Sequence, residues 1–166
     1  MIHTLLSKLD KHLGLPTASA HCDIPCAIYD PAGAQMAALS VIRFLDLIAD
    51  MSGENNLSLA QQATLSRLVR EKEIHAAKVK DEVRVIWGDF LKQPQFDEYP
   101  DCHKLVHNIM LAGGACKQHI DVENGHKLMA LVNEFAEVFW KVKGVETYTA
   151  TCPYAPSVDT VYPKLG

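Results

Sequence analysis

The chain has 166 residues, of which 48% are hydrophobic and 22% are charged, and its formal net charge at pH 7 is −4. This length suits one compact domain with a single core. The negative charge disfavours a protein that binds nucleic acid through a general basic surface. No apolar run approaches the roughly 20 residues of a membrane span, so we expect no membrane association. Five scattered cysteines indicate free thiols in a reducing, cytoplasmic setting rather than a disulfide framework.

Residues 1–20 have the features of a cleavable leader that lacks an export signal. An amphipathic opening stretch is followed by "GLPTASA", whose glycine and proline break any helix. The sequence ending at Ala20 has the A-x-A form that signal-type peptidases favour, but charged residues interrupt the apolar core that a secretory signal needs. The alternative is a short N-terminal arm that stays attached.

Apolar residues recur at helical spacing in four later stretches of the chain. Ser58-x-x-Gln61 has the pattern of a capping box and opens the second of them. The expected helices cover residues 34–51, 58–94, 105–116 and 128–144. Four amphipathic helices joined by loops of moderate length predict an all-α fold, an up-down-up-down four-helix bundle over residues 33–143. The remaining residues, 144–166, are rich in Pro, Thr and Tyr, and we expect an irregular tail there.

Three potential metal ligands are concentrated in "HCDIPC", directly after the expected leader. They are His21, Cys22 and Cys26. On spacing alone they could form part of a zinc site, although such sites require four ligands at familiar spacings. They could also form a redox dithiol, for which C-x-x-C is the usual spacing, or they could be incidental.

Cleavage after Ala20 would change the chemistry of this segment. His21 would then offer an α-amine and an imidazole, and Cys22 an amide nitrogen and a thiolate, all linked through short chelate rings. Cys26 can supply a fourth donor after a turn that Pro25 restricts. Two nitrogens and two sulfurs in a plane suit Ni(II) or Cu(II) rather than zinc, with the imidazole left over as an axial ligand. Anionic thiolates stabilise the higher oxidation state, so such a site suits one-electron transfer.

Two further candidates are interpreted as structural. His103 and His107 share a helical face and could bind a metal, but no acidic or cysteine partner lies at matching spacing, which favours a polar helix face. Cys116 lies on the apolar stripe of the third helix and is expected to be a small buried hydrophobic residue.

The segment "HCDIPCAIYDPAGA" closely resembles the nickel hook of nickel-containing superoxide dismutases, whose mature chains begin His-Cys-Asp-x-Pro-Cys-x-x-Tyr-Asp-Pro. The resemblance continues through "WGDFLKQPQFDEYPDCHKL", "LAGGACK" and "FAEVFWK", and covers roughly residues 21–143. It implies a hook over residues 21–32 on a right-handed four-helix bundle, a homohexamer, and a dedicated peptidase that removes the leader. It also implies the reaction: superoxide is converted to dioxygen and hydrogen peroxide, with nickel alternating between +2 and +3.

Carried over by position, the resemblance assigns roles to five residues. The implied nickel ligands are His21, Cys22 and Cys26. Tyr29 matches a tyrosine over the open face of the metal, which limits access to small anions and orders water there. Asp23 matches a hook residue that helps to hold the local hydrogen bonds.

Three positions depart from the family pattern. A glutamate that orients the axial histidine is replaced by Ala37, its arginine partner by His75, and a second tyrosine near the site by Phe90. These changes leave the ligand set intact but alter how the axial imidazole is held. His75 is either a substitute partner or a surface histidine. The alternative function is a non-catalytic helical-bundle protein that binds zinc or nickel through its His-Cys-x-x-x-Cys segment.

Overall fold

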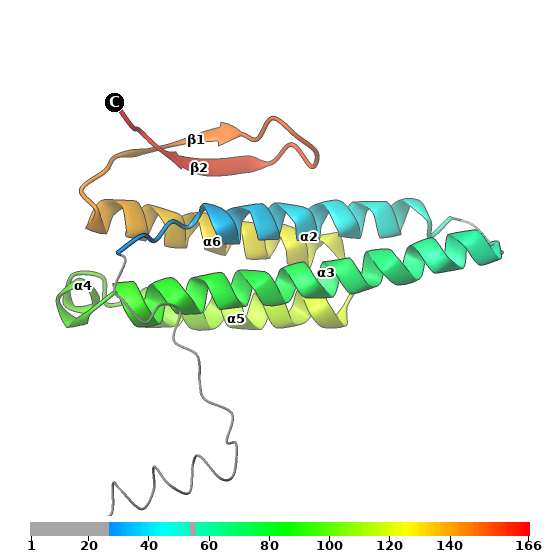
Figure 1. Cartoon of the computed structure of the whole chain (residues 1–166), viewed down its shortest axis with the longest axis horizontal. Helices are drawn as coiled ribbons and strands as arrows, with labels where there is room; N and C mark the ends of the chain where they lie inside the picture. The colour runs from blue at the N-terminus through cyan, green and yellow to red at the C-terminus, as the bar shows by residue number, and fades with distance from the viewer. Residues whose placement is uncertain (1–26, 54–55) are drawn as a thin grey trace, which may run out of the picture.

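The computed structural model describes residues 27–53 and 56–166, and these residues are mostly helical (Figure 1). The four long helices are α2 (Ala32–Asp50), α3 (Leu59–Val85), α5 (Cys102–Gln118) and α6 (Val122–Val142). A π-helical turn, η1 (Ile86–Phe90), continues α3, and the short α4 (Gln93–Glu98) leads to α5. Helix α2 packs against α3 and α6, and α5 packs against the same two helices. The expected long helices are therefore present, whereas α4 was not expected.

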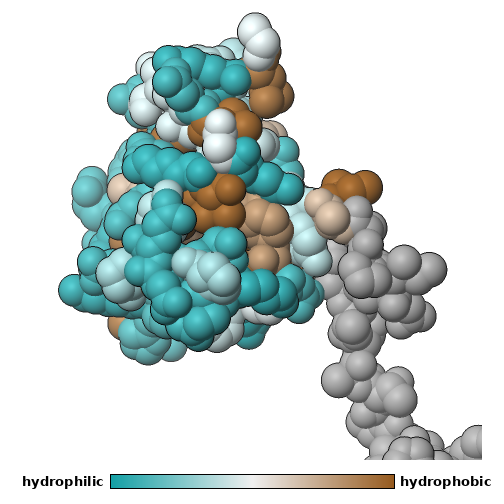
Figure 2. Space-filling model, turned by 90° about the vertical axis from the view of Figure 1, so that its left-hand side faces the viewer, coloured by the Kyte–Doolittle hydropathy of each residue, from teal (hydrophilic) through white to brown (hydrophobic). Residues whose placement is uncertain are grey.

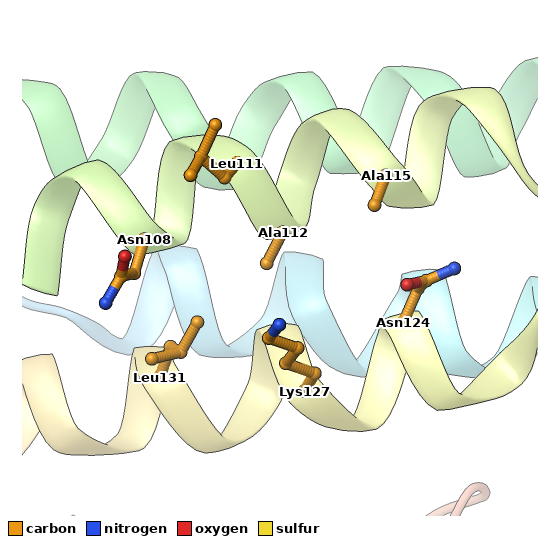
Figure 3. Close-up of a pocket in the computed structure, with 7 residues that line it drawn as sticks. All are labelled: Asn108, Leu111, Ala112, Ala115, Asn124, Lys127 and Leu131. Atoms are coloured by element: carbon orange, nitrogen blue, oxygen red, sulfur yellow. The ribbon is translucent and has the colours of Figure 1, made fainter.

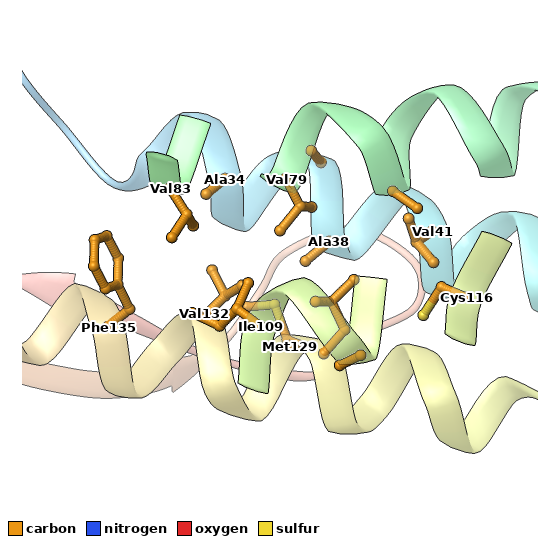
Figure 4. Packing of buried hydrophobic residues seen from close by; sticks show 14 of the residues in the cluster. Ala34, Ala38, Val41, Val79, Val83, Ile109, Cys116, Met129, Val132 and Phe135 are labelled. Atoms are coloured by element: carbon orange, nitrogen blue, oxygen red, sulfur yellow. The ribbon is translucent and has the colours of Figure 1, made fainter. Parts of the chain in front are cut away.

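Buried side chains of all four long helices meet in one hydrophobic core (Figure 4). In α2 the buried positions recur every three or four residues, which places them on one face of the helix. Contrary to the expectation from the sequence, helix α2 is long and apolar enough to cross a membrane by length and composition, but half of it is buried within the protein. Its apolar character is therefore explained by packing. Cys116 is fully buried, which confirms its interpretation as a small hydrophobic residue.

The predicted start of α3 is confirmed at the level of its hydrogen bonds. The Gln61 N–H donates to Ser58 Oγ at 3.3 Å, and the Ser58 N–H donates to Gln61 Oε1 at 2.8 Å. This reciprocal pair satisfies two backbone donors at the helix start. The predicted end of α6 at Gly144 also agrees, because that glycine adopts a φ of +70°, the left-handed conformation that terminates many helices.

The expectation of an irregular tail is wrong. Residues 147–163 contain two antiparallel strands, β1 (Thr147–Thr151) and β2 (Asp159–Pro163), in which Thr149 pairs with Val161. Threonine, valine and tyrosine fit a pleated surface well, so the composition that looked irregular also suits strands. The described chain is therefore helical with one added β-hairpin rather than all-α.

Two side-chain amides hold the hairpin on the helices. Gln35 of α2 donates through Nε2 to the Val161 carbonyl at 2.8 Å and to Asn133 Oδ1 at 3.2 Å. Asn133 of α6 accepts from the Val161 N–H at 3.1 Å and donates to the Asp159 carbonyl at 2.9 Å. Val161 is buried, so both of its backbone groups need these partners. The inner edge of β2 is therefore paired with the helices and shielded from water.

Candidate metal centre

The predicted ligands His21, Cys22 and Cys26 lie outside the described residues, as do Asp23 and the expected leader. The described chain begins at Ala27, immediately after the last ligand. Tyr29 is therefore the predicted site residue whose surroundings the structure defines.

The segment that leaves the hook is tied to the start of α2. The Ala32 N–H donates to Asp30 Oδ1 at 2.7 Å, and the Gln35 N–H donates to the Pro31 carbonyl at 3.0 Å. A carboxylate at a helix N-terminus is stabilised by the helix dipole. Ala27 has a φ of +56°, so the backbone bends sharply just after the last predicted ligand. The chain therefore enters α2 through Asp30 and Pro31 with the backbone N–H groups of Ala32 and Gln35 paired.

Tyr29 packs on a column of aromatic rings that joins three elements. Its ring centre lies 5.5 Å from that of Phe90 in η1, and Phe90 lies 5.0 Å from Phe139 of α6. Phe139 is buried, so the far end of the column is fixed in the core. Tilted ring pairs at these distances are favourable beyond their burial. The core thereby fixes the position of Tyr29 relative to the last turn of α6.

The π-helical turn presents Phe90 to Tyr29. It is marked by a hydrogen bond from the Leu91 N–H to the Ile86 carbonyl at 3.1 Å, five residues earlier. Such turns rotate the residues that follow them and are frequent at functional sites. Lys143, just after α6, places its ammonium 4.8 Å from the Phe90 ring centre. Neither the π-helical turn nor this lysine contact was expected from the sequence.

The surroundings of Ala37 and His75 show what the departures from the family pattern mean. Ala37 is buried and carries no polar atom that could orient an imidazole. His75 bonds through Nδ1 to the Glu71 carbonyl at 2.8 Å, and its ring packs 5.2 Å from that of Phe44. Because a carbonyl only accepts, His75 Nδ1 carries the proton. Phe44 lies about three turns beyond the start of α2, so these contacts favour a structural role for His75.

The sequence did not indicate that an acidic residue, Glu82, lies near the start of α2. The carboxylate of Glu82 on α3 lies so close to Gly33 that a Cβ at this glycine would be 2.9 Å from Oε2. Glycine therefore makes room for Glu82 beside the hook end of α2. No sequence spacing reveals this contact, because it depends on how α2 and α3 are aligned against each other.

The described residues offer no competing metal site. No group of three or more His, Cys, Asp or Glu side chains is gathered within residues 27–53 and 56–166. His103, one of the two histidines considered above, accepts a hydrogen bond at Nδ1 from Trp87 Nε1 at 3.0 Å and packs on Phe96. It therefore belongs to an aromatic cluster beside α4.

One surface groove among the described residues is also unlike a catalytic site. A groove of about 340 Å³ between α5 and α6 is lined by amide and aliphatic side chains and one lysine, Lys127 (Figure 3). It contains no thiol, imidazole or carboxylate. The end of the molecule near α4 and the last turn of α6 is mostly hydrophilic, with several small, separate hydrophobic patches (Figure 2).

Comparison with known proteins bears on the resemblance seen in the sequence. The family model described as nickel-containing superoxide dismutase matches residues 16–143. Superoxide dismutase [Ni] of Streptomyces coelicolor is 35% identical over 127 residues, which span 76% of this chain and 91% of the relative. The corresponding protein of Streptomyces seoulensis is 34% identical over 125 residues, or 75% of this chain and 89% of the relative.

Solved structures agree with these relatives. The native structure of a nickel superoxide dismutase matches with a TM-score of 0.65 and 34% identity, covering 74% of this chain and 99% of that one. The family match ends at residue 143, so the β-hairpin lies beyond it. Because the family model spans most of the chain and both relatives are more than 30% identical to it, the chain belongs to the nickel-containing superoxide dismutase family.

Proposed function

We propose that the chain, once processed to begin at His21, is a superoxide dismutase that converts two superoxide ions and two protons to dioxygen and hydrogen peroxide. The observation that carries this proposal is the hook sequence "HCDIPCAIY" within a family match that spans residues 16–143. The protein uses nickel, as its family description and the names of its relatives state.

The donor set of the hook fits nickel. His21 would contribute its amine and imidazole, Cys22 its amide nitrogen and thiolate, and Cys26 its thiolate. Nitrogen and thiolate donors of this kind suit a square-planar or tetragonal metal ion. When bound, nickel would supply one-electron redox chemistry between its +2 and +3 states. The amine exists only after cleavage behind Ala20, so the proposal requires a leader-processing peptidase.

The chain's own groups control access to this centre. Tyr29 is braced by Phe90, so its ring forms a fixed wall where the hook joins α2. A rigid ring excludes larger molecules and admits small anions, while its hydroxyl can donate a hydrogen bond to an anion or to water. Asp23 is proposed to accept hydrogen bonds within the hook and so to hold its turn.

The fold and assembly follow the same proposal. The four long helices would form an up-down-up-down bundle carrying an N-terminal hook over residues 21–32, and six chains would form a homohexamer. The order of helix contacts, in which each long helix packs on two others, supports the bundle. A reducing, cytoplasmic location is supported by Cys102, Cys116 and Cys152, which are buried without disulfides. No nucleic acid or membrane takes part.

A single ligand substitution tests the proposal. Cys22→Ser in the mature chain removes one thiolate and should abolish both nickel retention and superoxide consumption, measured by metal analysis and pulse radiolysis. The matched control is Cys152→Ser, which makes the same atomic change in the hairpin and should keep both. Nickel binding and superoxide consumption that survive Cys22→Ser would refute the proposed ligand set.

A further inference from the structure

Superoxide is an anion, and the chain as a whole repels it. The formal net charge of −4 makes the average field unfavourable for a negative substrate. At an ionic strength of 0.1 M, charges more than ~10 Å away are largely screened. Attraction must therefore come from a positive group within about this distance of the site.

Lys143 is a cation that the structure brings to this place. Its Nζ lies 4.8 Å from the centre of the Phe90 ring, and the same ring centre lies 5.5 Å from that of Tyr29. The separation between the ammonium and the Tyr29 ring cannot exceed the sum of these two distances, which is about one Debye length of ~10 Å. A second ring, Phe139, lies 6.0 Å from the same ammonium.

The way in which Lys143 is held preserves its charge. A carboxylate partner would cancel the positive charge, whereas an aromatic face attracts an ammonium and leaves its net charge intact. Lys141, two residues earlier, is paired with Glu137 at 3.7 Å. Lys143 makes no such ion pair within the described part of the chain. The aromatic column that braces Tyr29 therefore also orients a cation that has no carboxylate partner among the described residues.

We propose that Lys143 guides superoxide electrostatically to the Tyr29 side of the hook, and that Phe90 holds its ammonium in position. This role rests on the proposed function. Phe90 lacks the hydroxyl of the family's tyrosine, but its ring still provides the face against which the Lys143 ammonium packs. Lys143 does not touch the reacting atoms and acts only on the approach of the substrate.

The anchoring contact can be tested without turnover. Ring currents of Phe90 and Phe139 should shift the ε-methylene protons of Lys143 upfield in NMR spectra of the full chain. Phe90→Leu should return these protons toward their random-coil position. Unshifted protons in the wild-type chain would show that the ammonium is not held over the ring, and would overturn the proposal.

The guidance itself is tested by the salt dependence of the rate. Lys143→Gln, compared at equal nickel content, should lower the second-order rate constant for superoxide by about threefold at low ionic strength. The difference should disappear at ~0.5 M salt, where charges are screened within a few ångströms. Lys143→Arg should keep the wild-type rate and salt dependence, because it keeps the charge.

A matched control separates local guidance from overall charge. Lys127→Gln on α6 makes the same change in net charge about 24 Å along the helix axis from position 143, and should leave the rate unchanged. A Lys143→Gln rate equal to wild type at low salt, or a loss that persists at high salt, would overturn the role of Lys143. A wild-type chain that carries nickel but consumes no superoxide would instead refute the proposed function.

Discussion

Replacement of Gln35 by leucine tests whether the hairpin is docked on the helices. The substitution removes the donor to the Val161 carbonyl, and Val161 is only 3% exposed, so water cannot replace the lost partner. A buried carbonyl left unpaired costs roughly 1–3 kcal/mol. We expect the free energy of unfolding to fall by about 2 kcal/mol, which for a chain of this size lowers Tm by roughly 4–8 °C.

Urea titration followed by circular dichroism measures this loss, with Gln118→Leu as the control on an exposed site. Gln118 lies at the end of α5, so its substitution should change stability by less than ~0.5 kcal/mol. Asn133→Ala removes two neighbouring hydrogen bonds to the same strand, β2. The Gln35→Leu/Asn133→Ala double variant should therefore lose less unfolding free energy than the sum of the two single losses. A Gln35→Leu chain as stable as wild type would refute the docking of β2.

Two buried side chains, Cys116 and Lys72, allow further predictions. Burial raises the pKa of the Cys116 thiol from 9.0 to about 11. This thiol should therefore resist alkylation at pH 8 in the native chain and react promptly after unfolding. Fast alkylation of the native chain would contradict its burial. Burial also lowers the pKa of Lys72, whose ammonium donates to the Lys117 and His119 carbonyls at 3.0 and 2.9 Å. As the pH rises, the folded chain therefore loses this proton at a lower pH than the unfolded chain does. The free energy of unfolding of wild type relative to Lys72→Met should then increase as the pH rises toward 10.5, as measured by urea titration. A difference that falls with pH would contradict the lowered pKa.

The helices could be predicted from the sequence because their signals are local. Apolar spacing located all four long helices, and the Ser58 capping box fixed the start of α3 to the residue. Nickel and the dismutase family could likewise be predicted, since the hook motif is contiguous along the chain. Each of these features can be predicted from residues that are close together in the sequence.

The remaining features depend on contacts between distant segments. The hairpin was missed because Val161 is stabilised by Gln35 and Asn133, which lie far from it in sequence. The π-helical turn places Phe90 under Tyr29 through a single shift of hydrogen bonding, which residue periodicity does not report. The positions of Glu82 and Lys143 relative to the site likewise arise from helix packing.

We propose that the metal site requires a free amine at His21, and N-terminal processing of the chain provides the test. Chains produced with and without the leader-processing peptidase would be compared by intact mass, nickel content and superoxide consumption. The chain beginning at His21 should bind about one nickel ion per subunit and consume superoxide, while the chain beginning at Met1 should do neither. Equal nickel binding and equal activity in the uncleaved chain would contradict this proposal.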